Sequence, residues 1–208
     1  MWNTNDYQID IILIRHGRVP GNIEKRYIGS TNQSLTEEGK KELAGNKYPA
    51  AELLFTSPLN RCIETGEIIY PDLTVNIIDE FHEMDFGSFE GKNHQELDGN
   101  PEYQSWINSG GRLPFPGGES MERFILRVTR GVSAMLKTAI EYAEKKQNGS
   151  HKITIAAVVH GGTIMAIQTY LGLCDFYDKM YDNGEYRVVS TEVKYDISHD
   201  CITMRLHN

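Results

Sequence analysis

The sequence has few of the features that mark membrane, secreted or metal-binding proteins. No apolar run approaches the ~18 residues that a membrane-spanning helix needs. The N-terminal stretch from Met1 to Asp6 has neither the basic nor the apolar region of a secretory signal, so we expect a cytoplasmic protein. The cysteines are too few and too scattered to predict a disulfide framework or a zinc site: Cys62, Cys174 and Cys201.

The chain also lacks an excess of basic residues. Its 21 Lys and Arg face 29 Asp and Glu, giving a formal charge of −8. Because nucleic acids and anionic membranes bind basic surfaces, we expect neither as a partner. The hydrophobic share of 39% is enough for a packed core, and 208 residues predict a single domain spanning 1–208. A local cluster of cations would be opposite in sign to the net charge of the chain, so it would be worth looking for.

Short apolar runs alternate with helical patterns along the chain. Such alternation predicts an α/β fold, a three-layer sandwich with a mostly parallel central sheet and helices on both faces. Ile153–Val159 is apolar on both faces, as expected of a central strand. The predicted strands are 9–14, 52–56, 74–78, 153–159, and a late pair at 186–195 and 201–206 that could form a hairpin.

Capping residues predict where the helices begin. Thr36 and Ser120 are candidate N-caps, and Ser57 precedes Pro58 in the pattern of an N-cap followed by proline. The helix after Ser57 should run to about Tyr70, and another should follow Gly162 through Leu171. Apolar residues from 121 to 143 recur at i, i+3, i+4 and i+7, which predicts the longest helix with one face in the core.

Residues 85–118 have a different composition, rich in Gly, Pro and aromatic side chains. They carry too many large apolar groups for a solvated linker. We therefore expect an excursion from the sheet that shapes the substrate entrance, with short helical pieces near Gln95 and Tyr103.

Cationic residues follow three of the predicted strands. Arg15-His16-Gly17 follows the first, Arg61 comes in the helix after the second, and His160-Gly161-Gly162 follows the central strand. Open α/β sheets bind ligands beyond the carboxyl ends of their strands, so these side chains should meet. Two arginines with helix N-termini predict a bound anion, and phosphate suits several converging donors best.

These segments, in this order, resemble the histidine phosphatase superfamily, also called the phosphoglycerate mutase-like family. The resemblance covers about residues 9–171. The matching segments are Arg15-His16-Gly17 with Asn22, Tyr27-Ile28-Gly29, Leu35–Gly39, Ser57–Thr65, Glu83–Gly91, Pro116–Ser120 and Val159–Gly162.

The resemblance implies a role for each matching residue. His16 would be the nucleophile that forms a phosphohistidine, and a backbone carbonyl would fix its tautomer. Glu83 would protonate the leaving oxygen and then deprotonate water, a task that needs a raised pKa. Protonated His160 would bind phosphoryl oxygens. The remaining expected substrate contacts are Arg15, Arg61, Asn22 and Gly161. The resemblance implies no metal and no cofactor.

One departure concerns the residues after Arg15-His16-Gly17. The family often has an acid and then a hydroxyl residue there, whereas this chain has Arg18 and Val19. Arg18 either adds a cation near the pocket mouth or points to solvent, and the sequence leaves both open.

Other polar residues are given lesser roles. Asp85 is a candidate to support Glu83, Glu90 is expected to be structural, and Glu119 should serve the start of the long helix. The remaining histidines show no metal-ligand spacing: His82, His94, His151, His199 and His207.

Within the family, the sequence favours a phosphatase that acts on a small phosphorylated metabolite. Family mutases have extra basic residues in the excursion, whereas this chain has only Lys92 and Arg112 between Asp85 and Gly118. The segments around Phe86 and Pro116 are most similar to the α-ribazole phosphatase branch. A phosphoglycerate mutase and a non-catalytic phosphate-binding regulator are the alternatives, and the oligomeric state stays open.

Overall fold

The computed structural model describes residues 4–146, 151–196 and 201–206. Its centre is a six-stranded sheet with the order β3-β2-β4-β1-β5-β6. The four strands from β3 to β1 are parallel, while β5 runs antiparallel to β1 and pairs with β6 as a hairpin. The bounds are β1 Thr4–Arg15, β2 Leu53–Thr56, β3 Val75–Ile77, β4 Lys152–Val159, β5 Tyr186–Asp196 and β6 Cys201–Leu206. The predicted mostly parallel sheet and the late hairpin are confirmed.

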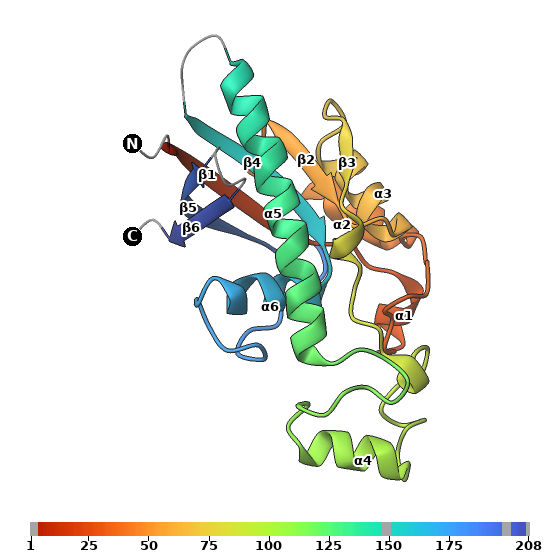
Figure 1. Cartoon of the computed structure of the whole chain (residues 1–208). Helices are drawn as coiled ribbons and strands as arrows, with labels where there is room; N and C mark the ends of the chain where they lie inside the picture. Colours follow the sequence, from red (N-terminus) through yellow and green to blue (C-terminus); the bar gives the residue numbers. More distant parts are fainter. Residues whose placement is uncertain (1–3, 147–150, 197–200, 207–208) are drawn as a thin grey trace.

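Helices cover both faces of this sheet (Figure 1). The α-helices are α1 Pro20–Ile23, α2 Glu37–Gly45, α3 Asn60–Ile69, α4 Pro101–Asn108, α5 Met121–Lys145 and α6 Gly161–Tyr170. Two short 3₁₀ helices are η1 Asp79–Phe81 and η2 Gly87–Phe89. No helix within the described ranges combines the length and apolar character needed to cross a bilayer.

The consecutive apolar residues of β1 explain why both faces of the sheet are covered. Ile9, Ile11 and Leu13 point into the larger core, which α5 and α6 complete. Ile12 and Ile14 point into a second core that includes α3. Since successive side chains of a strand face opposite sides, the consecutive apolar residues 11–14 need a helix layer on each face. The three-layer arrangement follows directly.

Two of the three predicted N-caps are confirmed. Thr36 Oγ1 accepts a hydrogen bond from the Gly39 amide at 3.0 Å, and Ser120 Oγ accepts one from the Arg123 amide at 3.3 Å. Ser57 is the exception, because α3 begins three residues later at Asn60. The Ser57 hydroxyl instead lies 2.7 Å from Nε2 of His160, a partner supplied by the tertiary fold.

Residues 85–118 project from the sheet and carry α4 at their far end (Figure 1). The predicted helical piece near Tyr103 is α4, but the one near Gln95 is wrong. There the backbone bonds are those of turns, from the Leu97 amide to the Asn93 carbonyl oxygen and from the Asp98 amide to that of Gln95, and Gly99 with φ of +76° ends the segment. An aromatic cluster with ring centroids 4.9 to 6.4 Å apart fills this segment: Tyr27, Phe86, Phe89, Tyr103, Trp106 and Phe115.

Candidate active site

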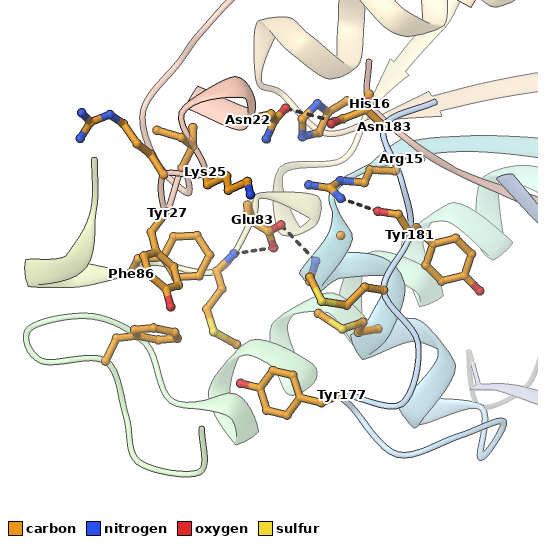
Figure 2. A pocket seen from close by; sticks show the side chains of 18 of the residues that line it. Arg15, His16, Asn22, Lys25, Tyr27, Glu83, Phe86, Tyr177, Tyr181 and Asn183 are labelled. Atoms are coloured by element: carbon orange, nitrogen blue, oxygen red, sulfur yellow. Dashed lines mark hydrogen bonds between the residues drawn. The ribbon is translucent and has the colours of Figure 1, made fainter. Parts of the chain in front are cut away.

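A cavity of about 620 Å³ lies beyond the carboxyl ends of β1 and β4. The parallel register pairs Arg15 with Val159, so His16 and His160 follow neighbouring strands at the same level. Their rings form an edge-to-face pair with centroids 5.2 Å apart. Three other parts of the chain complete the cavity wall: α1 contributes Asn22, the loop after η1 contributes Glu83, and the loop before β5 contributes Asn183 (Figure 2).

His16 is held in one tautomer by its own neighbour. Its Nδ1 lies 2.7 Å from the carbonyl oxygen of Gly17, so Nδ1 carries the proton and donates it there. Nε2 is then left with its lone pair. Burial lowers the pKa of His16 well below its ordinary value, and the charges of Arg61 and Arg15 lower it further. The ring is therefore neutral and nucleophilic at Nε2.

Arg15 is the strand-end arginine that lines the cavity. Its guanidinium donates to the carbonyl oxygen of Tyr181, whereas Nε is buried and has no partner among the described residues. Burial lowers the pKa of Arg15, and the nearby Glu83 carboxyl opposes that effect. A buried donor without a partner costs about 1–3 kcal/mol, so a bound anion would be stabilised here.

Arg61 and His160 lie beneath the cavity and do not line it. Both side chains are 0% exposed. The Arg61 guanidinium donates to the carbonyl oxygens of Thr31 at 2.8 Å and Gly29 at 2.9 Å, and its Nε lies 3.2 Å from Nδ1 of His160. All three nitrogens of Arg61 are thus occupied by protein acceptors.

The hydrogen bonds of His160 are those of a neutral ring. Arg61 Nε can only donate, so Nδ1 of His160 accepts and Nε2 donates to the Ser57 hydroxyl. Burial lowers the pKa of His160 well below its ordinary value, and Arg61 adds to the effect. The negative charge of a phosphoryl group would act in the opposite direction.

Glu83 reaches the cavity from the loop after η1. Its Oε1 accepts from the Met84 amide at 2.9 Å, and its Oε2 accepts from the Gly162 amide at 3.1 Å. Burial raises the pKa of Glu83 above its ordinary value, although these two hydrogen bonds and both arginines oppose the rise. A carboxyl with a raised pKa suits proton transfer near neutral pH.

The loop that carries Glu83 is fixed by Arg127 on α5. Arg127 donates to the carbonyl oxygens of Glu80 at 2.7 Å and of His82 at 3.1 Å. Glu119 lies 2.8 Å from Arg127 Nη2 in a largely buried ion pair. Glu119 therefore anchors an arginine, where the sequence suggested that it would serve the start of α5.

Asn183 is a cavity residue that the sequence did not single out. Its Nδ2 lies 3.0 Å from the carbonyl oxygen of His16 and 3.1 Å from Oδ1 of Asn22. Asn22 Oδ1 also accepts from the Val19 amide, which leaves its own Nδ2 unused by these bonds. Asn183-Gly184 is a turn dipeptide, so its only sequence signal was that of a loop.

Gly161 and Gly162 begin α6 and line the cavity. A Cβ at Gly162 would lie 2.4 Å from Glu83 Oε1, whereas one at Gly161 would make only an ordinary contact, 3.5 Å from Arg15 Nε. The close approach at Gly162 is what lets its amide reach the carboxyl.

The remaining polar residues fall outside the centre of the site. Arg18 does not line the cavity and pairs with Glu42 at 3.3 Å on the surface, which answers the choice that the sequence left open. Glu90 is structural, since it accepts from the amides of Gly29 and Thr31. The Asp85 side chain accepts a hydrogen bond from the Gly87 amide.

Among the other histidines that the structure describes, only His94 lines the cavity. His199 and His207 lie outside the described residues. Within the described ranges, no three His, Cys, Asp or Glu side chains are grouped as metal ligands would be.

This α/β protein places a neutral histidine, a buried arginine and a carboxyl of raised pKa around one cavity beyond its parallel strands, an arrangement suited to binding an anion. The histidine phosphatase superfamily (branch 1) matches residues 11–193. The chain belongs to this superfamily.

Relatives in the superfamily include phosphatases and mutases. An adenosylcobalamin/alpha-ribazole phosphatase of Escherichia coli is 31% identical over 132 residues, 59% of this chain and 64% of the relative. Phosphoserine phosphatase 1 of Hydrogenobacter thermophilus is 26% identical over 200 residues, 91% of this chain and 90% of the relative. The match to a bifunctional protein of Mycobacterium tuberculosis, 32% identical, spans only 35% of that protein.

Solved structures give the same fold. The alpha-ribazole phosphatase of Shigella flexneri aligns over 96% of each chain with a TM-score of 0.69 and 26% identity. A phosphoglycerate mutase of Thermus thermophilus aligns over 96% of this chain and 99% of its own, with a TM-score of 0.61 and 26% identity. The predicted phosphoglycerate mutase-like fold is confirmed.

Proposed function

We propose that this chain, acting as a single domain, is a phosphomonoesterase that hydrolyses a small phosphorylated metabolite through a phosphohistidine on His16. The observation that carries the proposal is the hydrogen bond from His16 Nδ1 to the Gly17 carbonyl oxygen. It leaves the Nε2 lone pair available for attack on phosphorus, with a ring that is neutral at physiological pH.

The reaction has two displacements. In the first, Nε2 of His16 attacks phosphorus, the bond from phosphorus to the ester oxygen breaks, and protonated Glu83 gives its proton to the departing oxygen. In the second, the Glu83 carboxylate takes a proton from water, the oxygen attacks phosphorus, and the bond to Nε2 breaks. His16 returns to its neutral form and inorganic phosphate leaves.

Protein donors replace a metal ion in stabilising the charge on the phosphoryl oxygens. Arg15 is the direct ligand in this proposal, together with Asn22 Nδ2 and the Gly161 amide at the start of α6. Arg61 and His160 support it from below: Arg61 adds positive charge beside His16, and His160 would gain a proton as phosphate charge enters. No cofactor is required.

A phosphatase is preferred to a mutase because the excursion offers the leaving group little positive charge. Lys92 donates to the Ser88 carbonyl oxygen, and neither it nor Arg112 lines the cavity. α-Ribazole phosphate is the first specific candidate, since relatives in both comparisons carry that activity in their names. The assays described below would also identify a mutase or a non-catalytic regulator.

The test is phosphate release from p-nitrophenyl phosphate by the wild type and by His16→Ala. We expect the variant to lose at least ~1,000-fold in kcat/KM, since it lacks the nucleophile. Arg18→Ala, at the surface pair with Glu42, is the control with near wild-type activity. Equal activity of His16→Ala and the wild type would remove the nucleophile assignment. A panel of α-ribazole phosphate, 3-phosphoglycerate, sugar phosphates and nucleotides then identifies the substrate, and phosphoryl transfer within 3-phosphoglycerate without net phosphate release would identify a mutase.

A further inference from the structure

Lys25 has a backbone conformation that is unusual for a residue with a side chain. Its φ is +54°, and it is the only residue other than glycine with a positive φ in the described part of the chain. L-residues with a Cβ rarely adopt this left-handed conformation because Cβ crowds the following carbonyl oxygen. Such outliers persist where the surrounding structure enforces them, and they cluster at functional sites.

The end of α1 explains why φ is positive at this position. The Arg26 amide donates to the Gly21 carbonyl oxygen at 2.9 Å, and the Lys25 amide donates to that of Asn22 at 3.2 Å. This is the paired bonding of a Schellman C-cap, in which glycine is the usual residue at the left-handed position. The backbone therefore favours glycine, and the lysine side chain needs a separate reason.

The side chain of Lys25 faces the cavity. Lys25 is one of the lining residues, and Figure 2 shows its ammonium end directed toward the same space as Glu83 and Arg15. It has no ion-pair partner among the residues that the structure describes. No ion pair joins Lys25 to Glu83 in the described part of the chain, and Arg61 and Arg15 are the cations that oppose the rise in the pKa of that carboxyl.

The neighbouring cation shows the contrast. Arg26 also lines the cavity, but its guanidinium is paired with Glu24 and with Glu96, and it donates to the Gly91 carbonyl oxygen. Its charge is therefore neutralised by the protein. Lys25 adds an uncompensated positive charge to a cavity whose far side is apolar and aromatic.

We propose that Lys25 is a specificity-determining residue that binds a second anionic group, a carboxylate or phosphate, on the leaving group of the substrate. The proposal rests on the proposed phosphatase function and narrows it to phosphomonoesters of acids. Arg15 then binds the phosphoryl group that is transferred, and Lys25 binds the carboxylate or phosphate on the leaving group. Phosphomonoesters that lack a second anion are expected to be poorer substrates, so this subsite would replace α-ribazole phosphate as the first candidate by a phosphorylated acid.

Two matched pairs of compounds test the proposal. 3-Phosphoglycerate differs from glycerol 3-phosphate in a carboxylate, and fructose 1,6-bisphosphate differs from fructose 6-phosphate in a second phosphate. For at least one pair we expect the wild type to favour the more anionic member by about tenfold or more in kcat/KM, the usual worth of a charged hydrogen bond. Lys25→Gln and Lys25→Gly should both reduce this ratio to within about twofold.

Lys47→Gln is the matched control, because Lys47 is exposed and outside the cavity. It removes the same charge and should leave the ratio unchanged. Lys25→Gly should melt at or above the wild-type temperature, since glycine suits the left-handed position, so its loss of selectivity would not reflect unfolding. A ratio near one in the wild type for both pairs, or ratios unchanged by both Lys25 substitutions, would overturn the proposal.

Binding measurements keep this test separate from the proposed catalysis. Calorimetric titration of each compound into His16→Ala, with and without Lys25→Gln, compares affinities without turnover. A Lys25-dependent preference for the more anionic ligand, with no phosphate released by the wild type, would retain the subsite and refute the phosphatase. Phosphate release with no such preference would retain the phosphatase and refute the subsite.

Discussion

The Nε atom of Arg61 lies 3.2 Å from Nδ1 of His160, and neither side chain has any exposed surface. The remaining Arg61 nitrogens donate to loop carbonyl oxygens of Ile28, Gly29 and Thr31. Arg61 is therefore part of the framework that holds His160 in one tautomer as well as a source of positive charge near His16.

This framework predicts a large loss of stability for Arg61→Lys. A lysine ammonium lacks the planar fork and would leave buried carbonyl oxygens unpaired, each at a cost of about 1–3 kcal/mol. We expect the free energy of unfolding in urea to fall by about 3 kcal/mol. Arg18→Lys, at an exposed ion pair, should change it by less than about 0.5 kcal/mol. A small change at Arg61 would show that these bonds are dispensable.

Glu83→Gln should separate the two displacements. p-Nitrophenolate leaves without help from an acid, so His16 should still be phosphorylated, whereas deprotonation of water needs the carboxylate. We expect a burst of about one equivalent of p-nitrophenol, followed by a steady rate ~100- to 10,000-fold below the wild type. Asp85→Asn, an exposed carboxyl two residues along the chain, is the control. Full steady-state activity in Glu83→Gln would remove Glu83 from the mechanism.

The two glycines that begin α6 should respond differently to alanine. At Gly162 the new Cβ would lie 2.4 Å from Glu83 Oε1 and displace the carboxyl, so kcat should fall at least ~10-fold. At Gly161 the nearest atom would be Arg15 Nε at 3.5 Å, an ordinary contact, and activity should stay within about threefold of the wild type. The opposite order of activities would contradict the position of Glu83.

Asn183→Ala tests the residue that the sequence did not identify. Its loss frees the carbonyl oxygen of His16 and the side chain of Asn22, so the reacting groups should be held less accurately. We expect kcat to fall by about 10- to 100-fold with a smaller change in KM. Asn183→Asp places an acceptor beside two other acceptors, the His16 carbonyl oxygen and Asn22 Oδ1. Its kcat should therefore be no higher than that of Asn183→Ala. A change confined to KM would assign Asn183 to substrate binding alone.

The buried histidines predict how stability changes with pH. Burial lowers the pKa of His16 and of His160, so the unfolded chain binds their protons more tightly as the pH falls below about 6.5. Each histidine should then reduce the free energy of unfolding by up to ~1.4 kcal/mol per pH unit, and the contribution is complete above pH ~6.5. Glu83 acts the other way, because its raised pKa favours the folded state at low pH and that gain is lost as the pH rises.

Urea unfolding between pH 7.5 and pH 5.5 measures the combined slope. His16→Asn should be less sensitive to acid than the wild type, and Glu83→Gln more sensitive. Equal slopes in all three proteins would mean that these groups titrate alike in the folded and unfolded chains.

Much of the fold could be predicted because local patterns and tertiary demands agree. β1 is apolar at successive positions and lies between two cores, and the α5 stripe matches the residues that pack on the sheet. The order of strand-end motifs also placed Arg15, His16 and His160 near one another. These features depend on periodicity and on the geometry of parallel strands, and both can be predicted from residues that are close together in the sequence.

The rest depended on partners far away in the chain. The sequence predicts Ser57 as an N-cap, but in the folded chain its hydroxyl bonds to His160. The sequence identifies Asn183 only as a turn residue, and its bond to the His16 carbonyl oxygen forms only in the folded chain. The neutral state of His160 follows from complete burial, which no local pattern reports. Each difference arose where a tertiary contact replaced a local preference.

The position of β1 in the sheet has a consequence for how the protein is made. Its neighbours on the two sides are β4 and β5, both from the last third of the chain, although β1 itself leaves the ribosome first. The apolar run of β1 therefore waits without either partner until β4 and β5 have been synthesised. Such long-range pairing slows folding and exposes a β-prone segment to aggregation, so the nascent chain should depend on holding factors until β4 and β5 have emerged.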